Sequence, residues 1–284
     1  MPALARHAAG IYPPFGNISE QILRRGQFFP CPKLAAPYLC AMEMPPLLIV
    51  AHGQPSASET AEAELKLLGA AVGSHLPRRP VGTATLAQPG ALAAALALLG
   101  PGGRISPLFM GGGWFTRVHL PKRLAEAGAQ GWRVLEPMGC DPAVHDLAVQ
   151  IVVEADRATG PVSSVILAAH GSGQSPVPSD IAHHVAALIA ARLGLPRVIA
   201  GFIDQSPRLA ALSGHGAGAI CLPFFAAAGG HVSDDIPAAL AGAGFQGRIL
   251  PALGLDARLP ALIAAAVRAD QAICTTECRW RKAL

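Results

Sequence analysis

The sequence Ile49-Val-Ala-His52-Gly53 reappears, with related residues, as Leu167-Ala-Ala-His170-Gly171. Each motif ends an apolar run of strand length with a histidine and a glycine. A proline follows each histidine at the same distance, because Pro89 and Pro207 both lie 37 residues further on (89 − 52 and 207 − 170). The pattern predicts that the chain contains an internal repeat.

A second pair of spacings supports the repeat. Pro107 precedes Pro121 by 14 residues, and Pro223 precedes Pro237 by the same distance (121 − 107 and 237 − 223). Only the intervals between the two proline pairs differ, 18 residues against 16 (107 − 89 and 223 − 207), which a loop can absorb. We therefore expect two homologous domains, residues 45–160 and 161–284.

Short apolar runs alternate with helical patterns throughout both copies. The expected strands are 47–51, 81–87, 104–110, 132–135, 164–169, 198–203, 217–225 and 248–250. The expected helices are 57–73, 89–99, 118–127, 142–155, 179–193, 207–212, 233–243 and 257–269. This alternation predicts an α/β fold, in which each domain has a parallel sheet of about four strands with helices on both faces.

The composition excludes several classes of protein. Hydrophobic residues make up 51% of the chain and charged residues 14%, which favours a large buried core over disorder. The longest charge-free run, between Arg79 and Arg104, is broken by Pro89-Gly90 and is too short on either side to cross a bilayer. The net charge of +4 is spread without a basic run, so we expect neither nucleic acid nor a membrane as partner.

The two ends of the chain differ from the repeat. Residues 1–44 are rich in proline without a sustained period, and we expect a poorly ordered extension, although a regulatory tail is the alternative. Without a signal-peptide pattern in it, the expected location is the cytoplasm. Cys274 and Cys278 form a short Cys/Arg tail, where two thiols are too few for a complete cluster site, so an unstructured tail is favoured.

Polar side chains follow several of the predicted strands. His52 and His170 each end the first strand of their domain, and Asp204 and His231 follow later strands of the second domain. The carboxyl ends of parallel strands meet at one edge of a sheet, where ligands bind. Two imidazoles and one carboxylate suit a divalent transition metal, and a neutral imidazole also accepts protons near pH 7. The second domain therefore has a candidate metal site made of His170, Asp204 and His231.

The repeat gives an internal comparison for this site. Counted from the aligned prolines, His231 corresponds to Phe115 and Asp204 corresponds to Leu86. The first domain thus keeps the strand-end histidine, His52, but has apolar residues at the other two positions. We expect its site to be degenerate.

The segments Ala168-Ala-His170-Gly-Ser, Phe202-Ile-Asp204-Gln-Ser-Pro207 and Gly229-Gly-His231-Val-Ser-Asp-Asp-Ile-Pro237 resemble the CbiX-type family of sirohydrochlorin cobaltochelatases and ferrochelatases. The resemblance runs from about residue 46 to the end, in two copies. It implies ATP-independent metal insertion into a tetrapyrrole held in a cleft between the domains. It also implies that His170 and His231 hold the metal and accept pyrrole protons, and that Asp204 stands where the family more often has glutamate.

The resemblance also implies a substrate and its surroundings. The metal, Co²⁺ or Fe²⁺ with Ni²⁺ as a further candidate, is a substrate, and the carboxylates of a sirohydrochlorin-type tetrapyrrole require arginines near the site. Arg208, Arg117 and Arg104 are candidates by position. Phe115 and His52 are expected to face the macrocycle, although His52 as a relic of a lost site is the alternative. No Gly-x-x-x-x-Gly-Lys-Ser/Thr motif occurs, so we expect no nucleotide. The fused repeat makes a monomer sufficient, and a homodimer stays open.

Two other functions stay open at this stage. The degenerate first domain is compatible with a non-catalytic tetrapyrrole or metal carrier. Ser172, after His170-Gly171, suggests a serine hydrolase, although no Gly-x-Ser-x-Gly elbow occurs. Asp234 and Asp235 are interpreted mainly as a helix cap, with metal delivery as the alternative, and His119 and His145 as surface residues.

Overall fold

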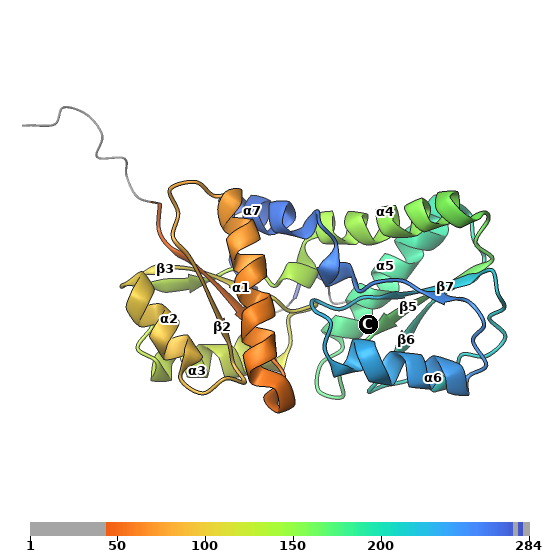
Figure 1. The fold of residues 1–284 in the computed structure, drawn as a ribbon, viewed down its shortest axis with the longest axis horizontal. Helices are drawn as coiled ribbons and strands as arrows, with labels where there is room; N and C mark the ends of the chain where they lie inside the picture. The colour runs from red at the N-terminus through yellow and green to blue at the C-terminus, as the bar shows by residue number, and fades with distance from the viewer. Residues whose placement is uncertain (1–43, 275–277, 281–284) are drawn as a thin grey trace, which may run out of the picture. The chain divides into compact units, whose positions relative to one another are not determined.

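The computed structural model describes residues 44–274 and 278–280. The predicted N-terminal extension, apart from Met44, and most of the predicted tail lie outside the described residues. The described residues belong to one compact unit that holds two parallel four-stranded sheets (Figure 1). The strands are β1 (Leu47–Ala51), β2 (Val81–Thr85), β3 (Gly103–Pro107), β4 (Trp132–Val134), β5 (Ser164–Ala169), β6 (Val198–Phe202), β7 (Ala219–Pro223) and β8 (Arg248–Ile249).

The two sheets repeat one topology. Their strand orders are β2-β1-β3-β4 and β6-β5-β7-β8. The register repeats as well, because Val50 pairs with Pro107 and Ala168 pairs with Pro223. The predicted duplication of an α/β fold is confirmed. In each sheet the chain leaves the central strand on one side and returns on the other, which makes the carboxyl end of β1 and of β5 a place for ligands.

Helices cover both faces of each sheet, as predicted. They are α1 (Ser58–Ser74), α2 (Ala91–Leu99), α3 (Leu120–Glu126), α4 (Pro142–Thr159), α5 (Val177–Leu193), α6 (Ile236–Gly242) and α7 (Leu259–Ala269). Successive strand residues point to opposite faces, so Leu47 and Ile49 join one hydrophobic cluster while Leu48 and Val50 join another. These side chains are fully buried, as expected for a parallel sheet covered on both sides.

Helix packing crosses the predicted domain boundary at residue 160. Helix α4, from the first half, packs against α5 of the second half, and α7 packs against α1 and β3 of the first (Figure 1). The largest hydrophobic cluster accordingly contains residues of both sheets. The boundaries 45–160 and 161–284 stay a prediction.

Three expected helices differ from their predictions. The expected helix 233–243 begins as a π-helical turn, His231–Asp235, before α6. The expected helix 207–212 is only a 3₁₀ turn, Leu209–Ala211. Pro207 instead accepts a hydrogen bond from the Phe202 N–H, and Arg208 is extended, so this segment continues the sheet edge. The expected helix 118–127 begins as a π-helical turn, Phe115–His119, before α3.

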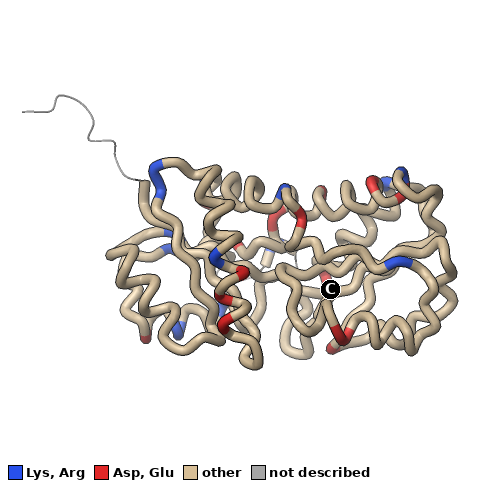
Figure 2. Tube along the Cα trace, viewed as in Figure 1, with Lys and Arg blue, Asp and Glu red and all other residues tan. Residues whose placement is uncertain are grey.

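Charged side chains are interspersed along the described trace (Figure 2), and some join distant elements. Arg258, beside α7, forms an ion pair with Glu154 of α4 at 2.5 Å. Arg104 of β3 pairs with Asp270 at the end of α7. Within the described ranges, no helix has both the length and the apolar character required to cross a membrane.

Candidate active site

The backbone after β5 and β6 brings His170 and Asp204 together. Ala169 ends β5, and the carbonyl of His170 accepts a hydrogen bond from the Asp204 N–H at 3.0 Å. Strand-like pairing therefore continues one residue beyond the sheet. The His170 Nδ1 atom lies 3.4 Å from the Asp204 Oδ2 atom.

The segment after β7 adds the second histidine. His231 begins a π-helical turn, His231–Asp235, that leads directly into α6. The ring centroids of His170 and His231 lie 4.7 Å apart with an interplanar angle of 81°. The three residues that sequence analysis grouped, His170, Asp204 and His231, thus meet at one edge of the second sheet.

Asp235, interpreted from the sequence mainly as a helix cap, lies at the site. Its Oδ2 atom lies 2.6 Å from His231 Nδ1, and its side chain makes no capping hydrogen bond to α6. The capping interpretation is therefore wrong for Asp235. The spacing of four residues between a histidine and a carboxylate ahead of a predicted helix was the signal for this contact.

The hydrogen bonds define which nitrogen of each ring is available. A carboxylate at 2.6 Å only accepts, so His231 Nδ1 carries a proton, and in the neutral ring Nε2 has the lone pair. His170 Nδ1 lies 3.1 Å from the carbonyl oxygen of Gly171, which makes Nδ1 the donor there as well. Both rings therefore have Nε2 free of these bonds, the arrangement that a carboxylate or carbonyl partner gives to metal-binding histidines.

The site is open to solvent. The side chains of His170, Asp204 and His231 are 44%, 54% and 47% exposed. Over residues 44–274 and 278–280, no group of three or more His, Cys, Asp or Glu side chains is already arranged around a common metal position. The donors form a partial, accessible set and not a closed structural metal centre.

The first half reproduces the geometry with different side chains. His52 Nδ1 lies 3.0 Å from the carbonyl oxygen of Gly53, as His170 does from Gly171. The ring centroids of His52 and Phe115 are 4.5 Å apart, so Phe115 occupies the place of His231. His119 follows Phe115 by four residues, in the place of Asp235. Phe115 offers no metal donor at this place, and the degenerate character of the first site stays a prediction.

The predicted counterpart of Asp204 is wrong by one residue. The carbonyl of His52 accepts from the N–H of Ala87, as that of His170 does from Asp204. Leu86 instead matches Ile203 and is buried in the core. Counting back from the prolines failed because the loop between the strand end and the proline is one residue shorter in the first half. Position 87 is still apolar, so the degenerate character of the site is unchanged.

An aromatic cluster surrounds Phe115. Trp114 contacts Phe115 edge-on at 5.1 Å and stacks on His119 at 5.1 Å, and Phe109 lies 6.2 Å from Phe115. The Trp114 side chain is nonetheless 45% exposed. Burial, followed by the charge of Arg123, lowers the pKa of His119, which favours its neutral form. His119 is therefore part of this cluster and not an isolated surface residue.

His145 also differs from its prediction as a surface residue. It is 1% exposed within α4, and its Nε2 atom lies 2.8 Å from the carbonyl oxygen of Gly139. Burial lowers its pKa, because desolvation disfavours the charged imidazole. The residue packs in the protein interior and belongs to neither strand-end site.

The three predicted substrate arginines lie in different places. Arg104 pairs in register with Leu47, at the amino end of β1, and its guanidinium is bound by Asp270. The prediction for Arg104 is wrong, because it lies at the opposite end of the sheet from the histidines. Arg208 is exposed, and its Nη1 donates to the carbonyl of Ile203 at 2.6 Å, next to Asp204. Arg117 lies in the π-helical turn that begins with Phe115.

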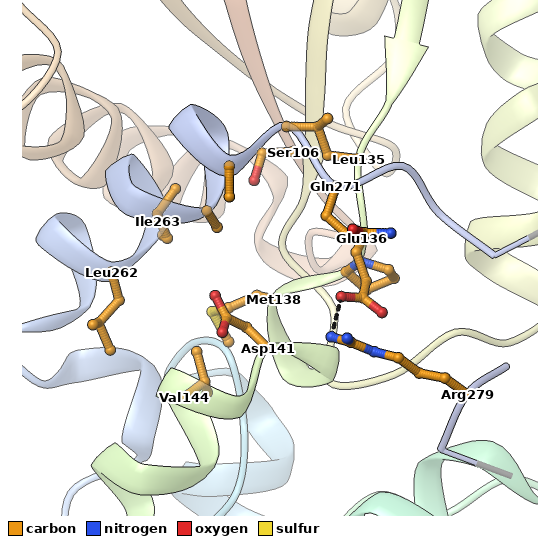
Figure 3. A pocket seen from close by; sticks show the side chains of 13 residues that line it. Ser106, Leu135, Glu136, Met138, Asp141, Val144, Leu262, Ile263, Gln271 and Arg279 are labelled. Atoms are coloured by element: carbon orange, nitrogen blue, oxygen red, sulfur yellow. Dashed lines mark hydrogen bonds and ion pairs between the residues drawn. The ribbon is translucent and has the colours of Figure 1, made fainter.

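Loops that carry the two strand-end sites touch each other. The Gly230 N–H donates to Oε1 of Gln54 at 3.3 Å, which joins the segment before His231 to the one after His52. A Cβ atom on Gly111 would lie 3.3 Å from Pro178, so the loop after β3 packs against the start of α5. The cleft expected between the halves stays a prediction. A cavity of about 190 Å³ lies elsewhere, lined by residues that include Glu136, Asp141, Ile263 and Arg279 (Figure 3).

Ser172 has a role in its own loop. Its hydroxyl oxygen accepts hydrogen bonds from the N–H groups of Gln174 and Ser175, both at 3.2 Å. The N–H of Ser172 itself donates to Oε1 of Gln205 at 2.8 Å. These contacts stabilise the turn that leads to α5.

Comparisons with known proteins find a matching family model and similar solved structures. The sequence model of the CbiX family matches residues 164–270. A solved structure described as CbiX, the terminal enzyme of siroheme biosynthesis in denitrifying bacteria, is 42% identical, with a TM-score of 0.73 over 79% of this chain and 98% of that one. A comparison with curated proteins gives no match.

More distant structures share the fold. SirB from Bacillus subtilis, solved with Fe³⁺, is 15% identical, with a TM-score of 0.62 over 80% of this chain and 95% of that one. A multi-domain protein from Deinococcus radiodurans, described as similar to chelatases, is 20% identical, with a TM-score of 0.60 over 80% of this chain and 54% of that one.

Proposed function

The chain belongs to the CbiX family and is a metal chelatase, and from this premise we propose that it inserts Co²⁺ or Fe²⁺ into a sirohydrochlorin-type tetrapyrrole without ATP. The observation that carries the proposal is the meeting of His170 and His231, with ring centroids 4.7 Å apart beside Asp204. The related SirB structures are described with Fe³⁺ and with cobalt, which is the reason for the choice of metals.

In this proposal the incoming ion is held by Nε2 of His170, Nε2 of His231 and the carboxylate of Asp204. Imidazole nitrogen and carboxylate oxygen suit a divalent ion such as Co²⁺ or Fe²⁺. Because each side chain is about half exposed, the ion can reach them from solvent and can leave them again. A chelatase requires such incomplete, accessible coordination, since it must hand the ion on to the macrocycle.

Once the ion has passed from Nε2 to the macrocycle, the same histidines are proposed to accept the protons that the pyrrole nitrogens lose. A neutral imidazole is a suitable base near pH 7. The Asp235 carboxylate, 2.6 Å from His231 Nδ1, would stabilise the imidazolium that forms when Nε2 takes a proton. Asp235 is a positioning residue in this scheme, because it acts through His231.

The first half is proposed to bind the macrocycle and not the metal. His52, Phe115 and the half-exposed Trp114 offer aromatic surface, which suits a flat conjugated ring. Gln54, which follows His52, accepts a hydrogen bond from Gly230, which precedes His231. The strand-end sites of both halves therefore border the same region. Arg208, beside Asp204, would pair with a peripheral carboxylate. Such peripheral contacts can supply the binding energy that distorts the ring and exposes its nitrogen lone pairs.

A carrier that binds tetrapyrrole or metal without turnover is the second candidate. The incomplete donor set and the apolar first half are the observations that favour it. The two candidates differ in stoichiometry, because a carrier stops after one equivalent.

The test is incubation of the purified chain with excess sirohydrochlorin and Co²⁺ in the absence of nucleotide. The proposal predicts many turnovers per chain, at a rate well above the rate without protein. The change in absorbance measures both. One bound equivalent with no further conversion would establish the carrier, and a rate equal to the protein-free rate without binding would refute both candidates.

A further inference from the structure

Residues 278–280 dock on the segment that follows β4. The Nε1 atom of Trp280 and the Nη2 atom of Arg279 both donate to the carbonyl of Cys140, at 2.7 and 3.0 Å. The same guanidinium forms an ion pair with Glu136 at 2.6 Å, as Figure 3 shows. These contacts join positions about 140 residues apart in sequence, and they place Cys278 beside Cys140.

The two thiol side chains lie close together. The Cys140 S–H and the Cys278 sulfur are hydrogen-bonded, and the side chains are only 1% and 4% exposed. Both cysteines are free. A Cβ atom on Gly112 would lie 3.8 Å from Cys278 Sγ, so the pair also borders the glycine loop that precedes Phe115.

The surroundings distinguish the two sulfurs. The hydrogen bond from Cys140, with the charges of Arg117 and Arg279 nearby, holds the pKa of Cys278 below its ordinary value. The hydrogen bond to Cys278, together with burial, raises the pKa of Cys140. Cys278 is therefore the more acidic thiol of the pair and Cys140 the less acidic one.

We propose that Cys140 and Cys278 form a dithiol site that reacts with low-molecular-weight disulfides and closes an intramolecular disulfide. The site lies outside the strand-end histidines, and the inference does not rest on the proposed metal insertion. The closed bond would fasten residues 278–280 to the segment after β4 and to the Gly112 loop.

The reaction is a pair of thiol–disulfide exchanges. The Cys278 thiolate attacks one sulfur of the small disulfide, whose S–S bond breaks, and one small thiolate leaves and takes up a proton. Cys140 then loses its proton to solvent and attacks the Cys278 sulfur, and the second small thiolate leaves and is protonated. Two protein thiols are oxidised, and the small disulfide is reduced to two thiols.

Access to Cys278 requires release of residues 278–280. Their polar anchors are the ion pair with Glu136 and the two bonds to the Cys140 carbonyl, so loss of these few contacts is enough for a local opening. The Glu136 side chain is only 10% exposed. Its desolvation raises its pKa, whereas the charge of Arg279 lowers it by less. Glu136→Gln removes the ion pair and is expected to speed the reaction several-fold.

The experiment uses the reduced full-length chain, oxidised glutathione, intact-mass measurement and peptide mapping. The expected product has lost two hydrogens, carries no glutathione and contains a peptide cross-linked from Cys140 to Cys278. Cys278→Ser is expected to abolish the cross-link. Cys140→Ser is expected to leave one glutathione on Cys278, because the resolving thiol is missing.

Cys274→Ser is the matched control, since Cys274 lies four residues from Cys278 and is the rival partner in the same part of the chain. It is expected to leave the Cys140–Cys278 cross-link intact. A cross-link from Cys274 to Cys278 would overturn the proposal, and so would a Cys278 that stays reduced while other cysteines react. Circular dichroism of Cys140→Ser distinguishes a missing thiol from a failure to fold, and Cys278→Ser gives a second test that leaves the segment after β4 unchanged.

Discussion

His231 Nδ1 lies 2.6 Å from Asp235 Oδ2 across the π-helical turn that precedes α6, and both side chains are about half exposed. Such a carboxylate fixes the tautomer of a metal-binding histidine and raises its basicity. Asp235→Asn keeps the size of the side chain but removes its charge. We expect metal insertion to slow by about 10–100-fold, with a change in its pH profile.

Asp234→Asn is the control for this substitution, because Asp234 lies in the same turn and has the same charge. It is expected to leave the rate and the pH profile near those of the parent chain. If both variants lost the same fraction of the metal-insertion rate, the negative charge near α6 would be responsible, and not the contact between Asp235 and His231.

The repeat predicts that the first half can be given a metal site. The triple variant Ala87→Asp, Phe115→His and His119→Asp would place the donors of the second half at the positions that the structure makes equivalent. In equilibrium dialysis, the number of Co²⁺ ions bound per chain is expected to rise from one to two. A variant with Leu86→Asp in place of Ala87→Asp should stay at one, since Leu86 points into the core.

Asp270 is expected to stabilise the fold by its charge. Its hydrogen bonds with Arg104, and then the charges of Arg104 and Arg133, lower its pKa from 3.8. A carboxyl with a lowered pKa contributes stability above its unfolded pKa and loses it as the pH falls through the folded value. Asp270→Asn should therefore lower the free energy of unfolding by about 1 kcal/mol at pH 7, a value reduced for solvent exposure.

Urea unfolding at several pH values checks this prediction. The difference between the parent chain and Asp270→Asn should stay constant at neutral pH and shrink below the unfolded pKa of 3.8. Asparagine tolerates the left-handed backbone of residue 270, whose φ is 53°, so the comparison isolates the charge. A difference that persists unchanged at low pH would contradict the assignment to this ion pair.

Gly254 supports the segment that carries His231. A Cβ atom there would lie 2.0 Å from the Ala226 oxygen, and the Gly254 N–H donates to the Phe225 carbonyl. Gly254→Ala must displace that backbone and should cost about 1–3 kcal/mol in thermal or urea unfolding, with slower metal insertion. Gly242→Ala, where a Cβ atom meets nothing within 4 Å, should be neutral or stabilising.

Most of the fold could be predicted from the sequence because its signals are local. Apolar runs followed by histidine and glycine mark the strand ends, and repeated proline spacings reveal the duplication. The packing of α4 on α5 and of α7 on α1 could not be predicted, because helical periodicity shows which face is apolar but not which helix covers it.

The residues of the site could be predicted where the strand order alone brings them together. They could not be predicted where the alignment of the two halves differs by one residue. His170, Asp204 and His231 follow strands whose ends must meet, so the sequence was sufficient to group them. The counterpart of Asp204 is Ala87 and not Leu86, because backbone hydrogen bonds, which proline counting does not see, set the alignment. Arg104 was misplaced for a related reason, since it begins its strand and does not end it.

The most direct test of the account compares His170→Ala with His52→Ala in the rate of metal insertion into sirohydrochlorin. The two histidines follow equivalent strands, and the Nδ1 atom of each lies within hydrogen-bonding distance of the carbonyl oxygen of the next glycine. We predict that His170→Ala reduces kcat by at least about 100-fold, while His52→Ala mainly raises KM for the tetrapyrrole. Equal effects on kcat, or a His170→Ala variant as active as the parent chain, would contradict a single metal site in the second half.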